Sequence, residues 1–229
     1  MLHLILAESA LELVPEEIRK HPVIRRYARK RGKRPGHVLL DSVYHYAAMK
    51  NLPDWKKRGR PDIAYITLVT VMDTPLNKAG MLRVYVHTLH DEIIRLKPNT
   101  RLPRGYHRFV GLMEQVLIEG KAPPDSDDPL IWVERGTVKE LVERIKPKAT
   151  IGFSLNGEKK EIWEVFKDVK LNGDIAVIVG GFPHGEFKRE TLKVMDKVYC
   201  VDPDPLCAWT VALMAVFAYS LAIGLRRFG

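Results

Sequence analysis

Two strand-and-loop units near the carboxyl end, within residues 174–208, constrain the fold more than any other part of the sequence. Residues 175–179 form a short apolar run rich in β-branched side chains, which predicts a buried strand rather than a helix. Three glycines and a proline shape the loop that begins at Gly180, and a second predicted strand at 197–201 leads into a proline-rich loop at 202–205. In α/β proteins, ligands bind beyond the carboxyl ends of neighbouring strands. We therefore predict a ligand site between the two loops.

The rest of the chain has the pattern of an α/β fold. With 229 residues, of which 46% are hydrophobic, it is long enough to bury a full core. Residues 2–6 and 82–88 have the pattern of strands. After a Pro- and Asp-rich loop at 121–129, strand and helix patterns alternate, in the order 130–133, 138–145, 149–154, 161–166 and 175–179. This alternation predicts a mostly parallel sheet with helices on both faces.

The last apolar segment, residues 206–225, has two interpretations. It has no charged residue from Cys207 onward and is about as long as a membrane span. A helix that is apolar on all sides can equally be buried between a sheet and a second subunit. The segment is rich in alanine, contains Trp209 and Ser220, and directly follows the second loop. We therefore favour a buried helix at a homodimer interface, with no membrane span.

The cysteines and the amino-terminal residues indicate the compartment. Cys200 and Cys207 lack the spacing of metal ligands, and a chain of this length with two cysteines is typical of a reducing compartment. Residues 1–7 have no basic region before the apolar run, which favours a strand over a signal peptide. We therefore expect a cytoplasmic protein without a metal site.

The positive charge is confined to one half of the chain. Residues 1–120 carry 21 Lys and Arg against 12 Asp and Glu, whereas residues 121–229 carry 16 of each. The whole net charge of +9 therefore lies in the first half, while both candidate ligand loops lie in the neutral half. Charge that only aids solubility would not be expected to segregate in this way. The distribution predicts a polyanion held beside a small-molecule site.

Three basic clusters account for this excess. Residues 19–34 contain nine basic residues and no acidic one. In residues 56–62, Arg60 is two positions from Asp62, close enough for a charge-assisted hydrogen bond that fixes the guanidinium. Asp62 could also serve only to compensate the dipole of the helix predicted at 63–72. The third cluster surrounds the start of another predicted helix, and its arginines are Arg101, Arg104 and Arg108.

The third cluster is typical of a phosphate clamp. We expect Arg101 on the loop before the helix, and Arg104 and Arg108 on one helix face, because they are four residues apart. The planar guanidinium can bind a phosphate through two parallel hydrogen bonds, which lysine cannot do. Backbone N–H groups at a helix start also favour anions.

A dinucleotide-binding fold is the main alternative for the first loop. Gly180, Gly181 and Gly185 follow a strand, and Asp202 lies about 20 residues further on. The spacing is Gly-Gly-x-x-x-Gly rather than Gly-x-Gly-x-x-Gly, and Pro183 stands where the phosphate-binding helix would begin. Too little chain follows to complete such a sheet. These three features exclude a nicotinamide-dependent enzyme with a dinucleotide-binding fold.

Five motifs resemble a known family. They are Arg-Pro-Asp-Ile (60–63), Pro-Leu-Asn-x-x-Gly (75–80), Val-Tyr-Val-His-Thr (84–88), Pro-Arg-Gly-Tyr-His-Arg-Phe-x-Gly-Leu-Met-Glu-Gln (103–115) and Gly-x-Phe-Pro-His-Gly (180–185). Over nearly the whole length, the chain resembles the ribosome-biogenesis pseudouridine methyltransferases, the Emg/Nep family of the SPOUT class. The resemblance implies one SPOUT-type domain over 1–229, with an RNA-binding half at 1–120. It also implies a cofactor-binding half at 121–229, with a trefoil knot at about 174–225.

The resemblance also implies an activity and its residues. A homodimer would transfer a methyl group from S-adenosylmethionine to N1 of a pseudouridine in small-subunit ribosomal RNA. The residues expected to bind RNA are Arg60, Arg101, Arg104 and Arg108, with Asp62 holding Arg60. The residues expected to bind the cofactor are Gly180, Gly185, Val201, Asp202, Pro203, Asp204, Pro205 and Leu206. The second loop reads Val-Asp-Pro-Asp-Pro-Leu-Cys-Ala, where the family tends to read Ile-Ser-x-Tyr-Pro-Leu-Ser-Ala. It keeps the proline and leucine, but the contacts of the replaced side chains do not carry over.

Methyl transfer from a sulfonium needs neither a metal nor a covalent intermediate, so we predict catalysis by positioning. Arg60 and Asp62 are the candidate catalytic residues. Asp62 could instead accept the N1 proton, but a neighbouring arginine stabilises its carboxylate form and makes it a weak base. The alternative function is a non-catalytic RNA-binding assembly factor, which would need the basic half but no cofactor crevice.

Overall fold

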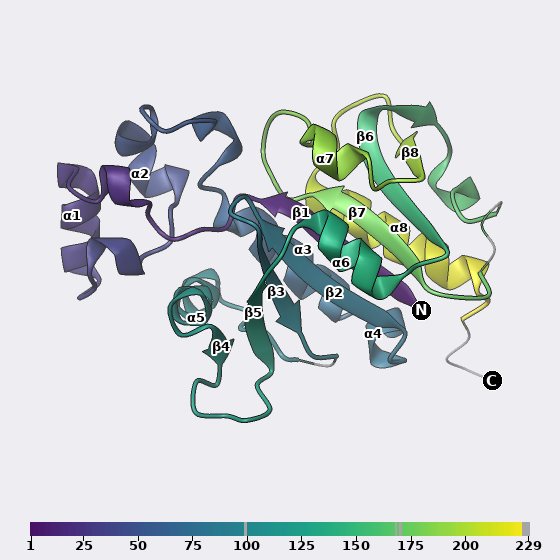
Figure 1. The fold of residues 1–229 in the computed structure, drawn as a ribbon, viewed down its shortest axis with the longest axis horizontal. Coiled ribbons are helices and arrows are strands. Elements are labelled where there is room, and N and C mark those ends of the chain that lie inside the picture. The colour runs from purple at the N-terminus through teal and green to yellow at the C-terminus, as the bar shows by residue number, and fades with distance from the viewer. Residues whose placement is uncertain (99, 168, 170, 226–229) are drawn as a thin grey trace.

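An eight-stranded sheet forms the centre of the protein (Figure 1), whose computed structural model describes residues 1–98, 100–167, 169 and 171–225. The strand order is β4-β5-β3-β2-β1-β7-β6-β8. The strands are β1 (Leu2–Ser9), β2 (Leu82–Thr88), β3 (Glu92–Leu96), β4 (Lys121–Ala122), β5 (Ile131–Arg135), β6 (Ala149–Lys159), β7 (Ile175–Gly180) and β8 (Lys197–Cys200). Strands β2, β1, β7, β6 and β8 are parallel, and β3, β5 and β4 are antiparallel. The predicted mostly parallel α/β sheet is confirmed.

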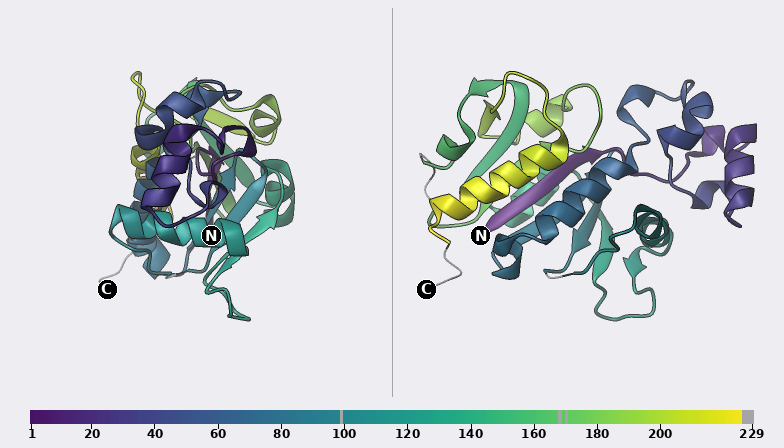
Figure 2. Two further views of the ribbon diagram at one scale, coloured as in Figure 1. Left: turned by 90° about the vertical axis from the view of Figure 1, so that its left-hand side faces the viewer. Right: turned by 180° about the vertical axis from the view of Figure 1, so that it is seen from behind.

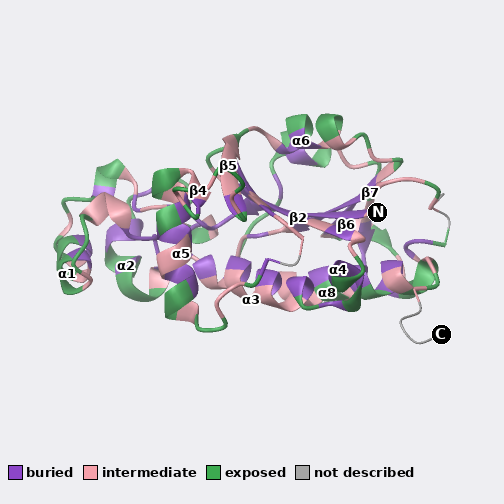
Figure 3. Ribbon diagram, turned by 90° about the horizontal axis from the view of Figure 1, so that it is seen from below, coloured by how far each residue is buried: buried purple, intermediate pink, exposed green. Residues whose placement is uncertain are grey.

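Helices cover both faces of this sheet, and the first two lie in a lobe at one end of it. The helices are α1 (Pro22–Lys30), α2 (Ser42–Met49), α3 (Pro61–Met72), α4 (Pro75–Lys78), α5 (Tyr106–Glu119), α6 (Val138–Ile145), α7 (Arg189–Leu192) and α8 (Ala208–Ala222). Figure 3 shows α6 above the sheet and α3 and α8 below it. The two lower helices pack against each other and run side by side (Figure 2). The prediction of helices on both faces is therefore confirmed.

The position of β1 in the middle of the sheet explains why its residues 4–7 are all apolar. Leu4 and Leu6 belong to the buried cluster that includes α3 and α8. Ile5 and Ala7 point to the other face and pack in the cluster of α6. A strand in the middle of a parallel sheet is buried on both sides, so its side chains do not alternate between apolar and polar.

The helix α8 corresponds to the long apolar segment of the sequence. Among the described residues, no helix is long and apolar enough to cross a membrane. Its inner residues Ala212, Ala215 and Val216 are buried in the main core. Small side chains there allow α8 to approach the sheet and α3 closely.

Residues 10–60, between β1 and α3, form a separate lobe at one end of the molecule (Figure 1). The 10–60 lobe contains α1 and α2 and has its own buried cluster, which includes Ile24, Val38 and Met49. Asp41 begins α2 by accepting a hydrogen bond from the Val43 backbone N–H at 2.9 Å. The lobe therefore holds its shape through a small core of its own, and must be fixed to the sheet by other contacts.

Candidate functional site

The first loop, residues 181–188, begins where β7 ends and is held against the end of β1. The N–H of Gly181 donates to the Ala7 carbonyl at 2.8 Å, and the Gly181 carbonyl accepts from the Ala10 N–H at 2.8 Å. A Cβ on Gly181 would lie 2.8 Å from the Cα of Ser9, so only glycine fits this close approach. Gly185 has a φ of +92°, in the region that glycine alone adopts easily. The glycines thus fix the loop's path next to β1.

The second loop, residues 201–207, begins where β8 ends and leads directly into α8. The Asp202 side chain accepts a hydrogen bond from the Asp204 N–H at 2.9 Å, which closes a tight turn. The thiol of Cys200 donates to the Asp202 carbonyl at 3.1 Å. The carboxylate of Asp202, which stands where the family pattern has a serine, therefore shapes the loop's own backbone.

A cavity of about 200 Å³ lies between the two loops, as the sequence predicts. Its apolar wall includes Phe153, Leu155 and Val179. The predicted cofactor residues that line it are Gly180, Gly185, Val201, Asp202, Asp204, Pro205 and Leu206. Pro203 is the exception, because it borders a separate surface hollow on the other side of the loop. Apolar walls with backbone polar groups at the strand ends suit a small ligand that carries an aromatic base.

A second hollow, of about 590 Å³, lies next to this cavity. It is bounded by the 10–60 lobe, Arg60 and the first loop, and it shares Pro183 and His184 with the cavity. Two neighbouring spaces with a common wall can hold two reactants side by side.

Arg60 and Asp62 stand at the edge of the second hollow, where α3 begins. Nε of Arg60 donates to Oδ1 of Asp62 at 2.8 Å, and Nη2 donates to Oδ2 at 2.7 Å. This bidentate contact raises the pKa of Arg60 and holds its guanidinium in one plane. Cys207, at the end of the second loop, is close enough to add to this shift. The predicted pair is therefore formed, and it lies beside the two loops that border the cavity.

The other three arginines lie elsewhere on the chain. Arg101 and Arg104 border a hollow at the far end of α3, with Asp73 and Lys78. The expectation that Arg104 and Arg108 share a helix face is wrong, because α5 begins only at Tyr106 and Arg104 precedes it. Among the described residues that line the cavity and the second hollow, none of the three appears. Any RNA that contacts all four arginines must therefore extend along α3 or reach across to another subunit.

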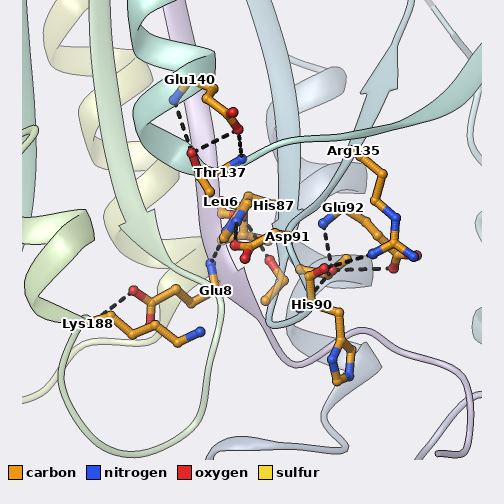
Figure 4. A network of polar contacts seen from close by, with 12 residues as sticks. Leu6, Glu8, His87, His90, Asp91, Glu92, Arg135, Thr137, Glu140 and Lys188 are labelled. Atoms are coloured by element: carbon orange, nitrogen blue, oxygen red, sulfur yellow. Dashed lines mark hydrogen bonds and ion pairs between the residues drawn. The ribbon is translucent and has the colours of Figure 1, made fainter.

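A buried carboxylate joins the 10–60 lobe to the first loop, a contact that sequence reasoning missed. Glu8, at the end of β1, is fully buried and accepts hydrogen bonds from Lys57 Nζ and from the backbone N–H of Lys188. Figure 4 shows the second of these contacts, which is 2.8 Å long. Lys57 also donates to the Glu186 carbonyl at 2.6 Å and lies 3.9 Å from the centre of the Phe182 ring. A single ammonium group thus contacts β1 and two positions of the first loop.

Two more buried glutamates fix the same lobe. Glu12 accepts from Nε and Nη2 of Arg58 at 2.8 and 2.6 Å, and pairs with His90 Nε2 at 2.7 Å. Burial alone would raise the pKa of Glu12, but the hydrogen bonds from Arg58 and His90 outweigh it and lower that pKa. Glu114 of α5 accepts from Arg31 at 2.6 Å and from Lys33 at 2.6 Å. Arg31, Lys33 and Lys57 therefore attach the lobe to the rest of the protein, and Glu12 does so through His90.

Sequence comparisons agree with this architecture. The fold and the cavity define an α/β protein with a small-molecule site beyond the carboxyl ends of its parallel strands. The model of the EMG1/NEP1 methyltransferase family matches residues 4–219. The chain belongs to this family, which confirms the resemblance seen in the sequence and the prediction of a methyltransferase.

Individual relatives cover nearly the full length. The chain is 48% identical over 219 residues to the ribosomal RNA small subunit methyltransferase Nep1 of Staphylothermus marinus, covering 95% of each chain. It is 44% identical to the Nep1 of Thermococcus kodakarensis, with 98% of this chain and all of that protein covered. Among solved structures, Archaeoglobus fulgidus Nep1 bound to S-adenosylhomocysteine matches with a TM-score of 0.86 and 37% identity, covering 97% of this chain and 99% of that one.

Proposed function

We propose that this protein methylates N1 of a pseudouridine in small-subunit ribosomal RNA, using S-adenosylmethionine, and that it does so as a homodimer. The names of the relatives support the ribosomal RNA substrate, and the ligand of the Archaeoglobus structure supports the cofactor. The observation that carries the proposal is the common wall, Pro183 and His184, between the cavity of the two loops and the hollow at Arg60.

The cavity between the loops is the proposed cofactor site. S-adenosylmethionine carries its methyl group on a sulfonium sulfur. N1 of the base attacks the methyl carbon, the carbon–sulfur bond breaks so that S-adenosylhomocysteine leaves, and the N1 proton is released to solvent. The residues proposed to hold the cofactor are Gly180, Gly185, Val201, Asp202, Asp204, Pro205 and Leu206, with Pro203 supporting the turn. The apolar side chains at the back of the cavity exclude water from the reacting atoms.

Arg60 and Asp62 are proposed to position the nucleotide. Asp62 fixes the Arg60 guanidinium through two hydrogen bonds, which leaves its remaining N–H groups for a phosphate or a base oxygen. Both carboxylate oxygens of Asp62 are already engaged by Arg60, which argues for an orienting role rather than proton transfer. Catalysis then rests on holding N1 in line with the methyl group.

In this proposal the basic half and the neutral half of the chain have different roles. Residues 1–120 bind RNA, with Arg101, Arg104 and Arg108 holding phosphates beyond the flipped nucleotide. Residues 121–229 bind the cofactor, and the chain at about 174–225 forms the trefoil knot of the SPOUT class. The start of α8 lies against the same cavity as Gly180, through Ala208 and Val211, which supports a chain path that passes close behind the first loop.

The homodimer is supported by one stripe on α8. Leu213, Phe217 and Leu221 are spaced by four residues, so they lie on one helix face, and they are 40%, 62% and 60% exposed. Apolar side chains of this size in a continuous row are typical of a covered surface. A second copy of the chain is the occupant proposed here.

Mass spectrometry of RNA tests the proposal. A small-subunit RNA fragment is incubated with protein and cofactor, once with pseudouridine and once with uridine at the target. In pseudouridine the sugar is attached to C5 and N1 carries a hydrogen, whereas in uridine N1 carries the sugar. We expect a gain of one methyl group only in the pseudouridine RNA. Methylation of both RNAs, or failure to bind S-adenosylmethionine in calorimetry, would refute it.

A further inference from the structure

A partly exposed aromatic pair lies on the 10–60 lobe, where Trp55 packs at the edge of the lobe's core. Tyr46 of α2 is 50% exposed. The ring of Trp55, in a short helical turn at Trp55–Lys57, stands edge-on to it with ring centroids 5.5 Å apart and planes at 80°. Burial of these rings would be favourable, so their partial exposure leaves apolar area that a ligand can cover.

Two lysines hold positive charge above these rings. Nζ of Lys50 lies 5.0 Å from the centre of the Tyr46 ring, and Nζ of Lys56 lies 5.9 Å from that of Trp55. In the described part of the chain, neither lysine is found in an ion pair with a carboxylate. Flat rings beside unpaired ammonium groups are suited to nucleobases attached to a phosphate backbone.

The pair faces the site of the reaction. Tyr46 and Trp55 line the second hollow together with Arg60 and with His184 of the first loop. The charged side chains that line this hollow are Lys56, Arg58 and Arg60. Glu12 pairs with Arg58 and Asp62 with Arg60, so the unpaired positive charge comes from Lys56 and from Lys50 at the Tyr46 ring. Among the described residues, no acidic side chain lines the hollow. Charge complementarity therefore favours a polyanion over an acidic or neutral protein surface as its occupant.

We propose that Tyr46 and Trp55 form a stacking platform for unpaired RNA bases next to the target nucleotide. Proteins that recognise single-stranded RNA stack its bases on aromatic side chains, and each such contact is worth about 1–3 kcal/mol. The platform holds the neighbours of the nucleotide that Arg60 positions. This inference rests on the proposed function for its RNA substrate, and it adds a requirement that the bases beside the target be unpaired.

Substitutions of Tyr46 separate stacking from burial. Tyr46→Phe keeps the ring, Tyr46→Leu keeps apolar area without a π-face, and Val43→Ala on the same helix is the matched control, since Val43 is 79% exposed and does not line the hollow. The probe is a small-subunit RNA hairpin with 2-aminopurine beside the target in an unpaired loop. Affinity is measured by anisotropy, and stacking by quenching of the 2-aminopurine.

We expect Tyr46→Leu to weaken binding about 5- to 150-fold, the equivalent of 1–3 kcal/mol, and to reduce the quenching, because only Trp55 remains to stack. Tyr46→Phe and Val43→Ala should bind within about twofold of the original protein. The salt dependence of Tyr46→Leu should be unchanged, because no phosphate contact is lost. An RNA with the same sequence fully base-paired should lose no affinity through the substitution.

Three results would overturn the platform. They are equal affinity of the Leu and Phe variants, an equal loss on paired and unpaired RNA, and a changed sedimentation coefficient of Tyr46→Leu, which would assign this face to self-association. Methyl transfer to the RNA is measured in a separate assay, which distinguishes failure of the platform from failure of the proposed function. If pseudouridine is methylated while the Leu variant binds normally, the platform fails and the proposed function stands. If the original protein quenches the 2-aminopurine fluorescence of the RNA but never methylates the RNA, the proposed function fails and the platform stands.

Discussion

The buried carboxylate of Glu8 and the ammonium of Lys57 join the end of β1 to the segment that leads into Arg60. Lys57 reaches the first loop from the same position, through the Glu186 carbonyl. The placement of Arg60 relative to the cavity between the loops therefore depends on an ion pair whose ammonium also contacts Phe182 and Glu186 of the cavity wall.

Removal of one partner of this pair should destabilise the protein strongly. Lys57→Met leaves Glu8 charged and buried without its cation, and we expect a loss of about 3–5 kcal/mol in the free energy of unfolding, measured by denaturant titration. Lys56→Met, at an exposed neighbouring position, should change it by less than about 0.5 kcal/mol. The double variant Lys57→Met with Glu8→Gln should recover part of the loss. A double variant as unstable as the single one would contradict this account.

Asp62→Asn tests whether Asp62 orients Arg60 or accepts a proton. Loss of the bidentate contact frees the guanidinium, so we expect RNA affinity to fall together with kcat/KM, the latter by about 10²-fold. The pH dependence of kcat should keep its shape. If turnover collapses while RNA affinity stays the same, Asp62 acts as the base instead.

Arg104→Ala should weaken RNA binding and flatten its salt dependence. Each phosphate contact contributes about one unit to the slope of log K against log salt concentration, so the variant should lose about one unit. Lys139→Ala provides the control, since Lys139 lies on α6, on the opposite face of the sheet from α3. An unchanged slope for Arg104→Ala would remove this arginine from the phosphate contacts.

The stripe on α8 should determine the oligomeric state. Phe217→Asp places a charge in the proposed interface, and we expect sedimentation velocity to show a monomer where the original protein is a dimer. Val43→Asp, an exposed apolar position on α2, should remain dimeric. A protein that sediments as a monomer before any substitution would refute the dimer itself.

His45 should make stability depend on pH. Burial lowers the pKa of His45 to about 4, below the value near 6.5 expected for the unfolded chain. Protons therefore bind the unfolded chain preferentially, so its contribution is fully present above pH 6.5 and is lost as the pH falls toward 4. The free energy of unfolding should drop over this range by about 3 kcal/mol more in the original protein than in His45→Gln. Parallel curves for the two proteins would contradict the prediction.

The sequence predicted the parallel part of the sheet well and the antiparallel part poorly. Long apolar runs such as β1 and β7 are read directly from the residues, because burial on both faces leaves no other pattern. Strand β3 (Glu92–Leu96) was not expected. It has only five residues and follows a tight turn in which Asp91 has a φ of +55°, so its pairing with β2 and β5 is fixed by neighbours rather than by its own sequence.

The residues around the candidate site also fall into two groups, those that a local sequence pattern predicts and those that it does not. Arg60 and Asp62 are close in sequence, and the glycines of the first loop follow a strand, so both signals are local. Glu8 and Lys57 are 49 residues apart, and nothing in either segment indicates that they meet. Buried ion pairs of this kind are selected by the three-dimensional path of the chain.

The sequence by itself determined the α/β class, the two ligand loops, the separation of basic and neutral halves and the Arg60–Asp62 pair. Each of these depends on residue type and short spacing alone. Only the tertiary structure decided that the cavity between the loops shares a wall with the hollow at Arg60, that buried glutamates pair with four basic side chains of the 10–60 lobe, and that the other three arginines lie apart. These relationships join segments distant along the chain, and folding brings such segments together through the packing of the whole sheet.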